Sequence, residues 1–191
     1  MESEHLIKRT IDVVIGLLAL LVFSPVMIIA AIAIKVTMGG PVIFKQKRVG
    51  LHGKEFCMYK LRSMIMQDEE EEKQAWSKAG DPRITPLGHV LRKANIDELP
   101  QLINVLKGEM SLVGPRPERP QFVDKFKEEI PQYMIKHKVR PGMTGWAQIH
   151  GYRGDTSIEK RIEYDLYYIE NWTAGLDFKI LLMTFVKGIR A

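Results

Sequence analysis

The most prominent feature of the hydrophobic pattern is an apolar stretch from Val13 to Ile34, with Ser24 and Pro25 at its middle. An α-helix of about 22 residues rises roughly 33 Å, which is enough to cross the hydrocarbon core of a bilayer. Proline has no N–H to donate to the carbonyl of Leu21, and its ring crowds the preceding turn. The pattern therefore predicts a membrane helix that is interrupted at its centre.

Basic residues flank the apolar stretch on both sides. A helix that crosses the membrane once leaves its excess of positive charge on one side only. The equal flanks favour a re-entrant segment over residues 1–38, which enters the membrane, bends at Ser24-Pro25 and leaves by the face it entered. The flanking basic residues are Lys8, Arg9, Lys35, Lys45, Lys47 and Arg48.

Two other interpretations of this stretch remain open. A cleaved signal peptide could use Lys8-Arg9 as its basic region and residues 31–33 as its cleavage site, although the apolar part is longer than usual. An ordinary single span is the second alternative, because membrane helices tolerate proline when a neighbour satisfies the freed carbonyl. Ser24 could bond back to Leu20 in that case.

The remaining pattern predicts short elements separated by glycine and proline. Apolar residues at 42–44 and 55–59 around the turn Gly50–Gly53 predict a β-hairpin. We expect helices at 86–93, 120–129 and 157–169, the last capped by Ser157, and a rigid loop at 140–145. Apolar residues interspersed with lysines at 176–189 predict a helix lying in the membrane interface.

A further helix is predicted to begin at Asp97, which suits the N-cap position, with Pro100 in the first turn and Gly108 at the end. Its buried face is expected to consist of Leu99, Leu102, Ile103 and Leu106. These elements predict an α+β, mostly helical fold. A re-entrant hairpin at 1–38 is joined to a small globular catalytic domain at 39–191 with a short β-hairpin and interfacial helices.

Composition limits the partners. The chain has 191 residues, a net charge of +5 and one cysteine, Cys57, so it can form no intrachain disulfide. The positive charge is compatible with anionic lipid, a phosphorylated substrate or nucleic acid. We expect no nucleic acid, since no nucleic-acid-binding motif accompanies the charge, and we expect an anionic membrane surface beside the apolar stretch. No phosphate-binding glycine-rich loop or dinucleotide fingerprint occurs, which argues against kinases and dehydrogenases.

The acidic pair Asp97-Glu98 is the strongest candidate for chemistry. At a helix start, free N–H groups and the positive end of the dipole favour ionised carboxylates and bound phosphate together. Adjacent helical residues point about 100° apart, so one acid could attack while the other holds a divalent cation. An ordinary cap with a first-turn acid is the structural alternative.

Basic residues supply candidate phosphate ligands. Arg116 lies between two prolines that fix its loop, and Arg140 also precedes a proline. A preset guanidinium suits a bidentate grip on phosphate. Lys60 and Arg62 would share one face of a strand, and Arg92 lies just upstream of the acidic pair. Surface or lipid contact is the alternative for each, and His89, His137 and His150 are expected to be structural or solvated because they lack metal spacing. Together these features indicate phosphoryl transfer between a soluble donor and a lipid acceptor.

Several motifs, taken in order, resemble one known family. They are Lys8–Asp12, Ser24-Pro25, Gly40–Gly50, Lys60–Met64, Asp97–Asn104, Ser111–Pro117 and Arg140–Gly145. The family is that of the bacterial monotopic phosphoglycosyl transferases, or polyprenyl-phosphate sugar-1-phosphate transferases, and the resemblance runs from about Lys8 to Arg190. Because larger relatives carry additional spans before this core, the chain resembles the minimal form.

The resemblance implies that a UDP-sugar gives its sugar-1-phosphate to polyprenyl (undecaprenyl) phosphate and that UMP is released, the first membrane step of glycoconjugate assembly. It also implies that Asp97 is a nucleophile that forms a phosphosugar-aspartyl intermediate and that Glu98 holds Mg²⁺. Covalent catalysis by a carboxylate needs cations to neutralise the phosphate. The candidates for that role are Lys60, Arg62, Arg92, Arg116 and Arg140.

The family further implies a bacterial inner (cytoplasmic) membrane location, with the catalytic domain on the cytoplasmic face of the anionic inner leaflet. The motifs do not specify the sugar, although 146–155, with Gln148, Tyr152 and Arg153, could contact nucleotide or sugar. An interfacial enzyme could also form a homodimer through its membrane segment. A membrane-anchored scaffold without turnover is the rival hypothesis, which the intact acidic pair argues against.

Overall fold

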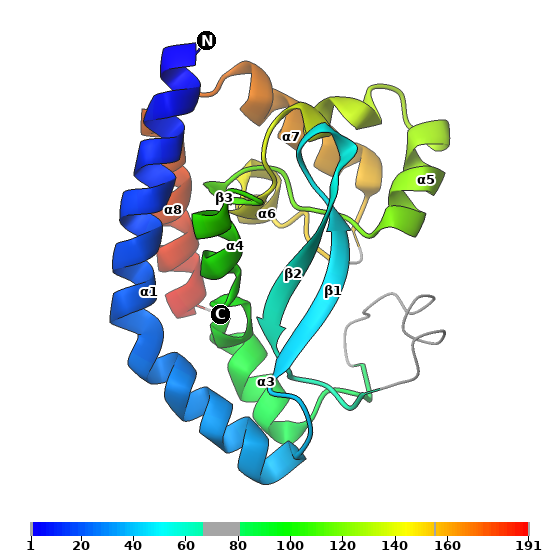
Figure 1. The fold of residues 1–191 in the computed structure, drawn as a ribbon. Coiled ribbons are helices and arrows are strands. Elements are labelled where there is room, and N and C mark those ends of the chain that lie inside the picture. Colours follow the sequence, from blue (N-terminus) through cyan, green and yellow to red (C-terminus); the bar gives the residue numbers. More distant parts are fainter. Residues whose placement is uncertain (1, 67–80, 155, 191) are drawn as a thin grey trace.

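The computed structural model describes residues 2–66, 81–154 and 156–190, most of which are helical (Figure 1). The α-helices are α1 (Glu2–Met38), α3 (Pro86–Lys93), α4 (Gln101–Lys107), α5 (Pro120–Glu129), α6 (Trp146–Ile149), α7 (Ile158–Glu170) and α8 (Ala174–Arg190). The strands are β1 (Ile43–Val49), β2 (Glu55–Leu61), β3 (Ser111–Val113) and β4 (Gly142–Thr144). Three 3-10 turns are η1 (Leu51–Gly53), η2 (Ile96–Glu98) and η3 (Tyr133–Lys138).

Helix α1 is continuous over 37 residues and contains Pro25 in its interior. Figure 1 shows that the helix bends near its middle. The hydroxyl of Ser24 donates to the carbonyl of Leu21 at 2.8 Å, which is the carbonyl that proline cannot serve. The prediction that Ser24 bonds to Leu20 is therefore wrong by one residue. The interruption expected at Ser24-Pro25 takes the form of a bend within an unbroken helix, because the serine replaces the missing hydrogen bond.

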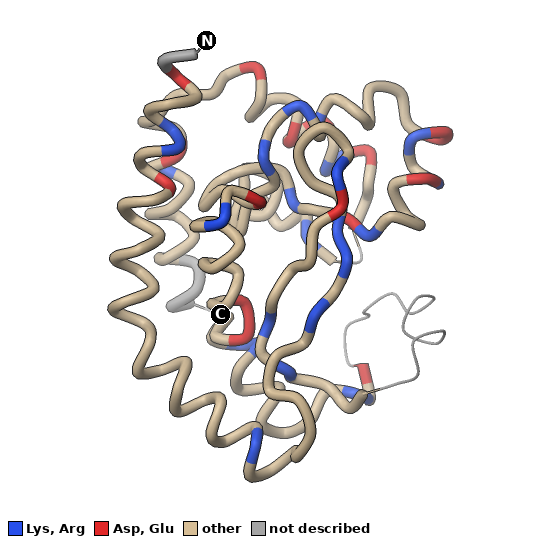
Figure 2. The backbone as a smooth tube through the Cα atoms, in the orientation of Figure 1, with Lys and Arg blue, Asp and Glu red and all other residues tan. Residues whose placement is uncertain are grey.

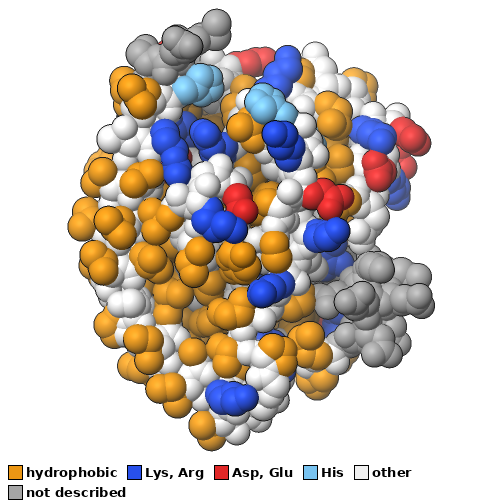
Figure 3. Space-filling view, in the orientation of Figure 1, with side chains coloured by type: hydrophobic (Ala, Val, Ile, Leu, Met, Phe, Trp, Pro, Cys, Tyr) orange, Lys and Arg blue, Asp and Glu red, His pale blue; other side chains and the backbone are white. Residues whose placement is uncertain are grey.

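The outward surface of α1 is apolar and carries no charge between Asp12 and Lys35 (Figure 2). Figure 3 shows hydrophobic side chains gathered over α1, with most basic side chains elsewhere on the same face. Within the described residues, Glu4–Met38 is the one helix long and apolar enough to cross a membrane, and only 11% of its most apolar window is buried. This composition suits contact with lipid.

The inward surface of α1 docks on the rest of the protein along much of its length. Near its N-terminus, Lys8 lies 2.6 Å from a carboxylate oxygen of Asp177 on α8. One turn later, the buried carboxylate of Asp12 accepts from the hydroxyl of Ser111 at 3.0 Å and from the N–H of Leu112 at 2.9 Å. Helix α1 is thus fixed to both β3 and α8.

Strands β1 and β2 form the predicted hairpin, with antiparallel pairs such as Gln46↔Met58 and Lys47↔Cys57. Both strands are longer than predicted. Their tight connection passes through left-handed conformations at His52 (φ 55°) and Gly53 (φ 73°). The hairpin packs against α4, which brings the strand that carries Lys60 beside the helix that follows the acidic pair.

A second, parallel sheet of two strands pairs β3 with β4. The sequence predicts a rigid loop at 140–145, whereas residues 142–144 form β4. The backbones meet closely here, because a Cβ added to Gly142 would lie 2.1 Å from the nitrogen of Gly114. Glycine is therefore required for this close approach of two chain segments.

Helices α3 and α5 have the predicted bounds, and Ser157 caps α7 by accepting from the N–H of Lys160. The predicted buried face of α4 is wrong in part, since Ile103 is 40% exposed while Asn104 and Val105 are fully buried. The reason is that α4 packs against α1 on one side and β2 on another.

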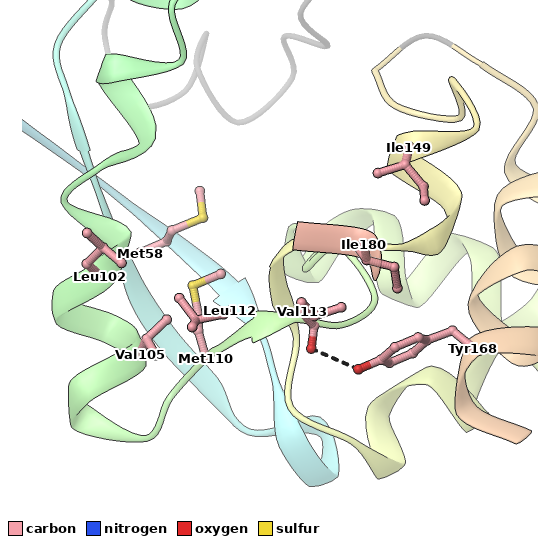
Figure 4. Close-up of a cluster of buried hydrophobic side chains, with 9 residues drawn as sticks. All are labelled: Met58, Leu102, Val105, Met110, Leu112, Val113, Ile149, Tyr168 and Ile180. Carbon is pink, nitrogen blue, oxygen red and sulfur yellow. Dashed lines mark hydrogen bonds between the residues drawn. The ribbon is translucent and has the colours of Figure 1, made fainter. Parts of the chain in front are cut away.

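The main hydrophobic core lies between α1, the two sheets and the C-terminal helices (Figure 4). The hydroxyl of Tyr168 on α7 donates to the carbonyl of Val113 on β3 at 3.1 Å, which satisfies a polar group inside this core. Its buried members are Met58, Leu102, Val105, Met110, Leu112, Val113, Ile149, Tyr168 and Ile180.

Helix α8 exposes apolar side chains at helical spacing: Phe178, Leu182 and Phe185 are 67%, 57% and 65% exposed. This amphipathic pattern agrees with the expected interfacial helix, whose contact with lipid stays a prediction.

Candidate active site

The acidic pair lies in η2, a tight turn between α3 and α4. Asn95 adopts the left-handed conformation (φ 53°) before this turn, and Pro100 occupies the N-cap position of α4. The prediction that Asp97 is the N-cap is therefore wrong. The left-handed residue starts an extra turn before α4, and that turn buries Asp97, which is 7% exposed.

Glu98 forms ion pairs with two cations that come from distant parts of the chain. Its Oε1 atom accepts from Nζ of Lys60 on β2 at 2.7 Å and from a guanidinium nitrogen of Arg116 at 3.1 Å. Burial alone would raise the pKa of Glu98, but the two cations outweigh it and hold this pKa well below its ordinary value. Glu98 is therefore a stable carboxylate at neutral pH.

Asp97 experiences the opposite balance. Burial and, second, the neighbouring charge of Glu98 raise the pKa of Asp97 from 3.8 to about 6. The positive charges of Lys60, Arg92 and Arg116 act against this rise. Two adjacent acids thus have pKa values displaced in opposite directions, which is typical of carboxylates with separate roles in one active site.

Arg92 lies in the last turn of α3, where its charge acts on Asp97. One of its guanidinium nitrogens contacts the sulfur of Met64 at 3.5 Å. The structure thus brings together Asp97 and Glu98 with three of the predicted basic residues: Lys60, Arg92 and Arg116.

The other two predicted arginines hold helix ends. Arg62 donates to the carbonyl of Met38 at 2.7 Å and to that of Gly39, at the C-terminus of α1. Arg140 donates to the carbonyl of Gly108 at 3.0 Å, just beyond the C-terminus of α4. Cations are favoured at helix C-termini, where carbonyls lack partners. Strand β2 ends at Leu61, so the strand period of two that would align Lys60 with Arg62 does not continue.

The loop that carries Arg116 is fixed by residues that the sequence reasoning did not assign to the site. Arg48 on β1 donates to the carbonyl of Pro117 at 3.0 Å and lies 3.8 Å from the carboxylate of Glu118. Arg161 on α7 donates to the other oxygen of Glu118 at 2.7 Å. The alternation of side chains along β1 could have identified Arg48, because every second residue is exposed and Arg48 lies on the opposite, less exposed face.

In the stretch 146–155, Tyr152 packs against an aromatic ring of α7 with centroids 4.9 Å apart, and Gln148 donates to a carbonyl of β4 at 3.4 Å. Arg153 is exposed, and Asp155 lies outside the described residues. The prediction that this stretch contacts nucleotide or sugar stays a prediction.

No group of three or more His, Cys, Asp or Glu in the described residues could hold a metal ion. His137 is buried, and burial followed by the charge of Lys136 lowers its pKa to about 4, so it is neutral.

The acidic pair fits Mg²⁺, which takes one or two protein carboxylates and completes its coordination with water and substrate phosphates. Glu98, the ionised member, would be the protein ligand.

Comparison with known proteins gives consistent matches. A family model described as bacterial sugar transferase matches residues 3–191. The chain is 47% identical over 190 residues to the UDP-glucose:undecaprenyl-phosphate glucose-1-phosphate transferase of Escherichia coli (strain K12), covering 97% of this chain and 40% of that protein. It is 49% identical over 180 residues to the UDP-N-acetylgalactosamine-undecaprenyl-phosphate N-acetylgalactosaminephosphotransferase of Aeromonas hydrophila, covering 93% and 42%.

A third relative is closer in length. The chain is 41% identical over 182 residues to the uncharacterized sugar transferase EpsL of Bacillus subtilis (strain 168), covering 95% of this chain and 87% of that protein. The chain therefore spans less than half the length of the first two relatives and most of the third.

Proposed function

Because the chain belongs to the bacterial sugar transferase family, we propose that it transfers a sugar-1-phosphate from a UDP-sugar to undecaprenyl phosphate and releases UMP. The observation that carries this proposal is the acidic pair itself, in which Asp97 is buried while Glu98 is ion-paired with Lys60 and Arg116. The cations suit the negative charge of a diphosphate, the ionised Glu98 suits holding those cations in place, and a second carboxylate suits attack on the phosphorus.

In the first step, a carboxylate oxygen of Asp97 attacks the phosphorus that carries the sugar. The bond from that phosphorus to the bridging oxygen breaks, and UMP leaves with the electron pair. The burial of Asp97 removes water from the nucleophile, and Arg92, Lys60 and Arg116 lie where they can attract the phosphate oxygens.

In the second step, an oxygen of undecaprenyl phosphate attacks the same phosphorus. The bond to Asp97 breaks, and the carboxylate is restored. Glu98 keeps Lys60 and Arg116 in place throughout, since it accepts from both. Mg²⁺ bound at Glu98 would supply further neutralisation of phosphate charge.

The contacts of α1 support a membrane geometry for this function. Lys8 near its start pairs with Asp177, and Arg62 binds the carbonyls of Met38 and Gly39 at its end. Both ends of α1 thus contact the same folded body, which supports a re-entrant helix bent at Pro25 rather than a span with ends on opposite sides. The catalytic domain would lie on the cytoplasmic face of the bacterial inner membrane, where the lipid acceptor presents its phosphate to Asp97.

The direct test is UMP release from a panel of UDP-sugars with undecaprenyl phosphate and magnesium. The panel includes glucose, galactose, their N-acetyl forms and a diacetamido-trideoxy sugar. Release of more than one UMP per protein molecule is expected for at least one sugar and should require both donor and acceptor, because the donor alone supports a single transfer to Asp97. Absence of release across the panel, from folded protein in lipid, would favour the rival scaffold function.

A further inference from the structure

Asn104 is a fully buried polar residue in the middle of α4, where its buried neighbours Leu102 and Val105 are apolar. Its side-chain amide makes three hydrogen bonds. The Oδ1 atom accepts from the N–H of Tyr59 at 3.1 Å, while Nδ2 donates to the carbonyl of Cys57 and to a carboxylate oxygen of Glu109, both at 2.7 Å. The orientation of the amide is determined by these partners, one donor and two acceptors.

Two of these partners belong to the backbone of β2. One edge of β2 pairs with β1, and on its other edge the amide of Asn104 takes the place of a further strand. The amide accepts from the N–H of Tyr59 and donates to the carbonyl of Cys57. Residues two apart on a strand present their backbone groups to the same edge, as they do toward a neighbouring strand. Both hydrogen bonds are partly buried, so without this amide the two backbone groups would lose their partner where access to water is reduced.

The next residue along β2 is Lys60, whose ammonium group binds Glu98. The turn that contains Glu98 leads into α4 within three residues. Strand β2 therefore makes two neighbouring contacts: Tyr59 with Asn104 on α4, and Lys60 with Glu98 in the turn that leads into α4. The first joins a side chain to backbone, and the second joins two flexible side chains.

We infer that Asn104 is a positioning residue, which fixes the register of β2 against α4 so that Lys60 meets Glu98. This inference rests on the proposed function and names a determinant of the same site. An apolar residue would fill this space without specifying a register, whereas a buried amide is stable only when its donors and acceptor all find partners. A shift of β2 by one residue would move the N–H of Tyr59 and the carbonyl of Cys57 away from the amide of Asn104 and break both hydrogen bonds.

Glu109 supports the same arrangement from the other end of α4. Its carboxylate accepts from Asn104 and also lies 2.9 Å from Nζ of Lys107, while its own N–H donates to the backbone carbonyl of Asn104 at 3.0 Å. Glu109 thus orients the amide of Asn104 independently of β2. This orders the side chain in advance and lowers the entropic cost of the contact.

A double-mutant cycle on kcat/KM for UMP release tests the inference. We expect Asn104→Ala and Lys60→Met each to lower kcat/KM by about 10- to 100-fold, through kcat more than KM. If Asn104 acts through Lys60, adding Asn104→Ala to Lys60→Met should lower kcat/KM further by less than about threefold. Two independent losses that multiply would overturn the inference.

A loss of folding is distinguished by two further variants. Asn104→Asp keeps the shape but places a carboxylate oxygen against two acceptors, Glu109 and the carbonyl of Cys57. Adding Glu109→Gln removes the repulsion between the two carboxylates and should restore part of the lost activity. Asn171→Ala removes an exposed amide that bonds only within its own helix turn, and it should leave activity unchanged. Failure of Glu109→Gln to restore any activity would contradict the proposed geometry.

A second readout needs no turnover, so it separates failure of this inference from failure of the proposed function. The exchange of backbone amide protons with solvent can be measured by NMR in detergent micelles. The N–H of Tyr59 donates to Asn104, so its exchange should become at least about tenfold faster in Asn104→Ala. Unchanged exchange of this proton in folded Asn104→Ala would overturn the inference even if the enzyme reaction proved different.

Discussion

Lys60 and Glu98 meet at 2.7 Å although 38 residues separate them in the chain. This ion pair joins the end of the β-hairpin to the turn that carries both acids, and Arg116 completes it from a third segment. The site is therefore assembled by tertiary packing, and its properties should respond to changes in each contributing element.

The nucleophile can be tested by covalent labelling. Asp97→Asn should abolish turnover and prevent incorporation of a radiolabelled sugar donor into the protein in the absence of acceptor, because an amide cannot attack the phosphorus. Asp124→Asn alters an exposed acid that pairs with Lys127 and should retain both properties. Persistent labelling of Asp97→Asn would assign the nucleophile to another residue.

The same substitution should affect stability in the opposite direction. Because the folded state raises the pKa of Asp97 from 3.8 to about 6, it disfavours the charged form that exists above pH 6. Each unit of pKa corresponds to about 1.4 kcal/mol, so Asp97→Asn should raise the free energy of unfolding by roughly 2–3 kcal/mol at pH 8. This gain should fade as pH falls from 6 and vanish below about 4, as measured by denaturation of detergent-solubilised protein. A gain independent of pH would contradict the assigned pKa.

The pH dependence of activity follows from the same value. Only the carboxylate form of Asp97 can attack, so kcat/KM should fall about tenfold per unit below pH 6 and level off above about pH 7. The acidic limb should move to higher pH in Lys60→Met, since the lysine lowers the pKa of Asp97. An acidic limb that stays in place would exclude Lys60 as an electrostatic neighbour of the nucleophile.

Glu98→Gln should lower kcat/KM by more than about 100-fold and increase the magnesium concentration required for half-maximal activity. The neutral amide leaves Lys60 and Arg116 without a counter-charge and offers the metal a weaker ligand. Glu163→Gln, which changes an exposed acid on α7, is the matched control. Full activity with unchanged magnesium dependence would show that Glu98 is not a metal ligand.

The position of α3 should be sensitive to one methyl group. A Cβ at Gly88 would lie 1.8 Å from the carbonyl oxygen of Ser63, so Gly88→Ala should destabilise the fold by roughly 3 kcal/mol or more and displace Arg92 on the same helix. A Cβ at Gly16 would make only ordinary contacts, at 3.5 Å or more, so Gly16→Ala should change stability by less than about 1 kcal/mol. Equal melting temperatures of the two variants would contradict this close packing.

The membrane geometry predicts that both ends of α1 are accessible from one side. In a Cys57→Ser background, single cysteines introduced at His5 and Lys45 should react with an impermeant maleimide only from the cytoplasmic side of oriented vesicles. Accessibility from opposite sides would establish a span and overturn the re-entrant proposal.

Much of the fold was predictable because prolines, glycines and capping residues mark its local boundaries. The helices at 86–93 and 120–129 begin with proline, and Gly108 ends α4 in the left-handed conformation. The parallel pair of β3 and β4 was not predictable in this way, since its strands have three residues each and depend on contact between distant glycines.

The acidic pair and three of its basic neighbours could be identified from sequence, but not how they pair. The spacing of Lys60 and Arg62 suggests one shared face. It does not reveal that Arg62 binds two carbonyls at the end of α1, because that contact depends on how α1 packs. Asn104 was overlooked because a helical hydrophobic pattern treats a polar residue as exposed, whereas here the backbone of β2 satisfies it.

The ion pair between Lys8 and Asp177 also constrains the order of biogenesis. The two residues are 169 positions apart, and a ribosome that adds about 5–20 residues per second needs on the order of 10–30 s to make the second after the first. In the proposed re-entrant arrangement, the N-terminal helix would reach the membrane while Lys8 still lacks its acidic partner. A basic residue beside a membrane helix resists translocation, so the nascent chain would stay on the side of synthesis until α8 is made and Asp177 pairs with Lys8.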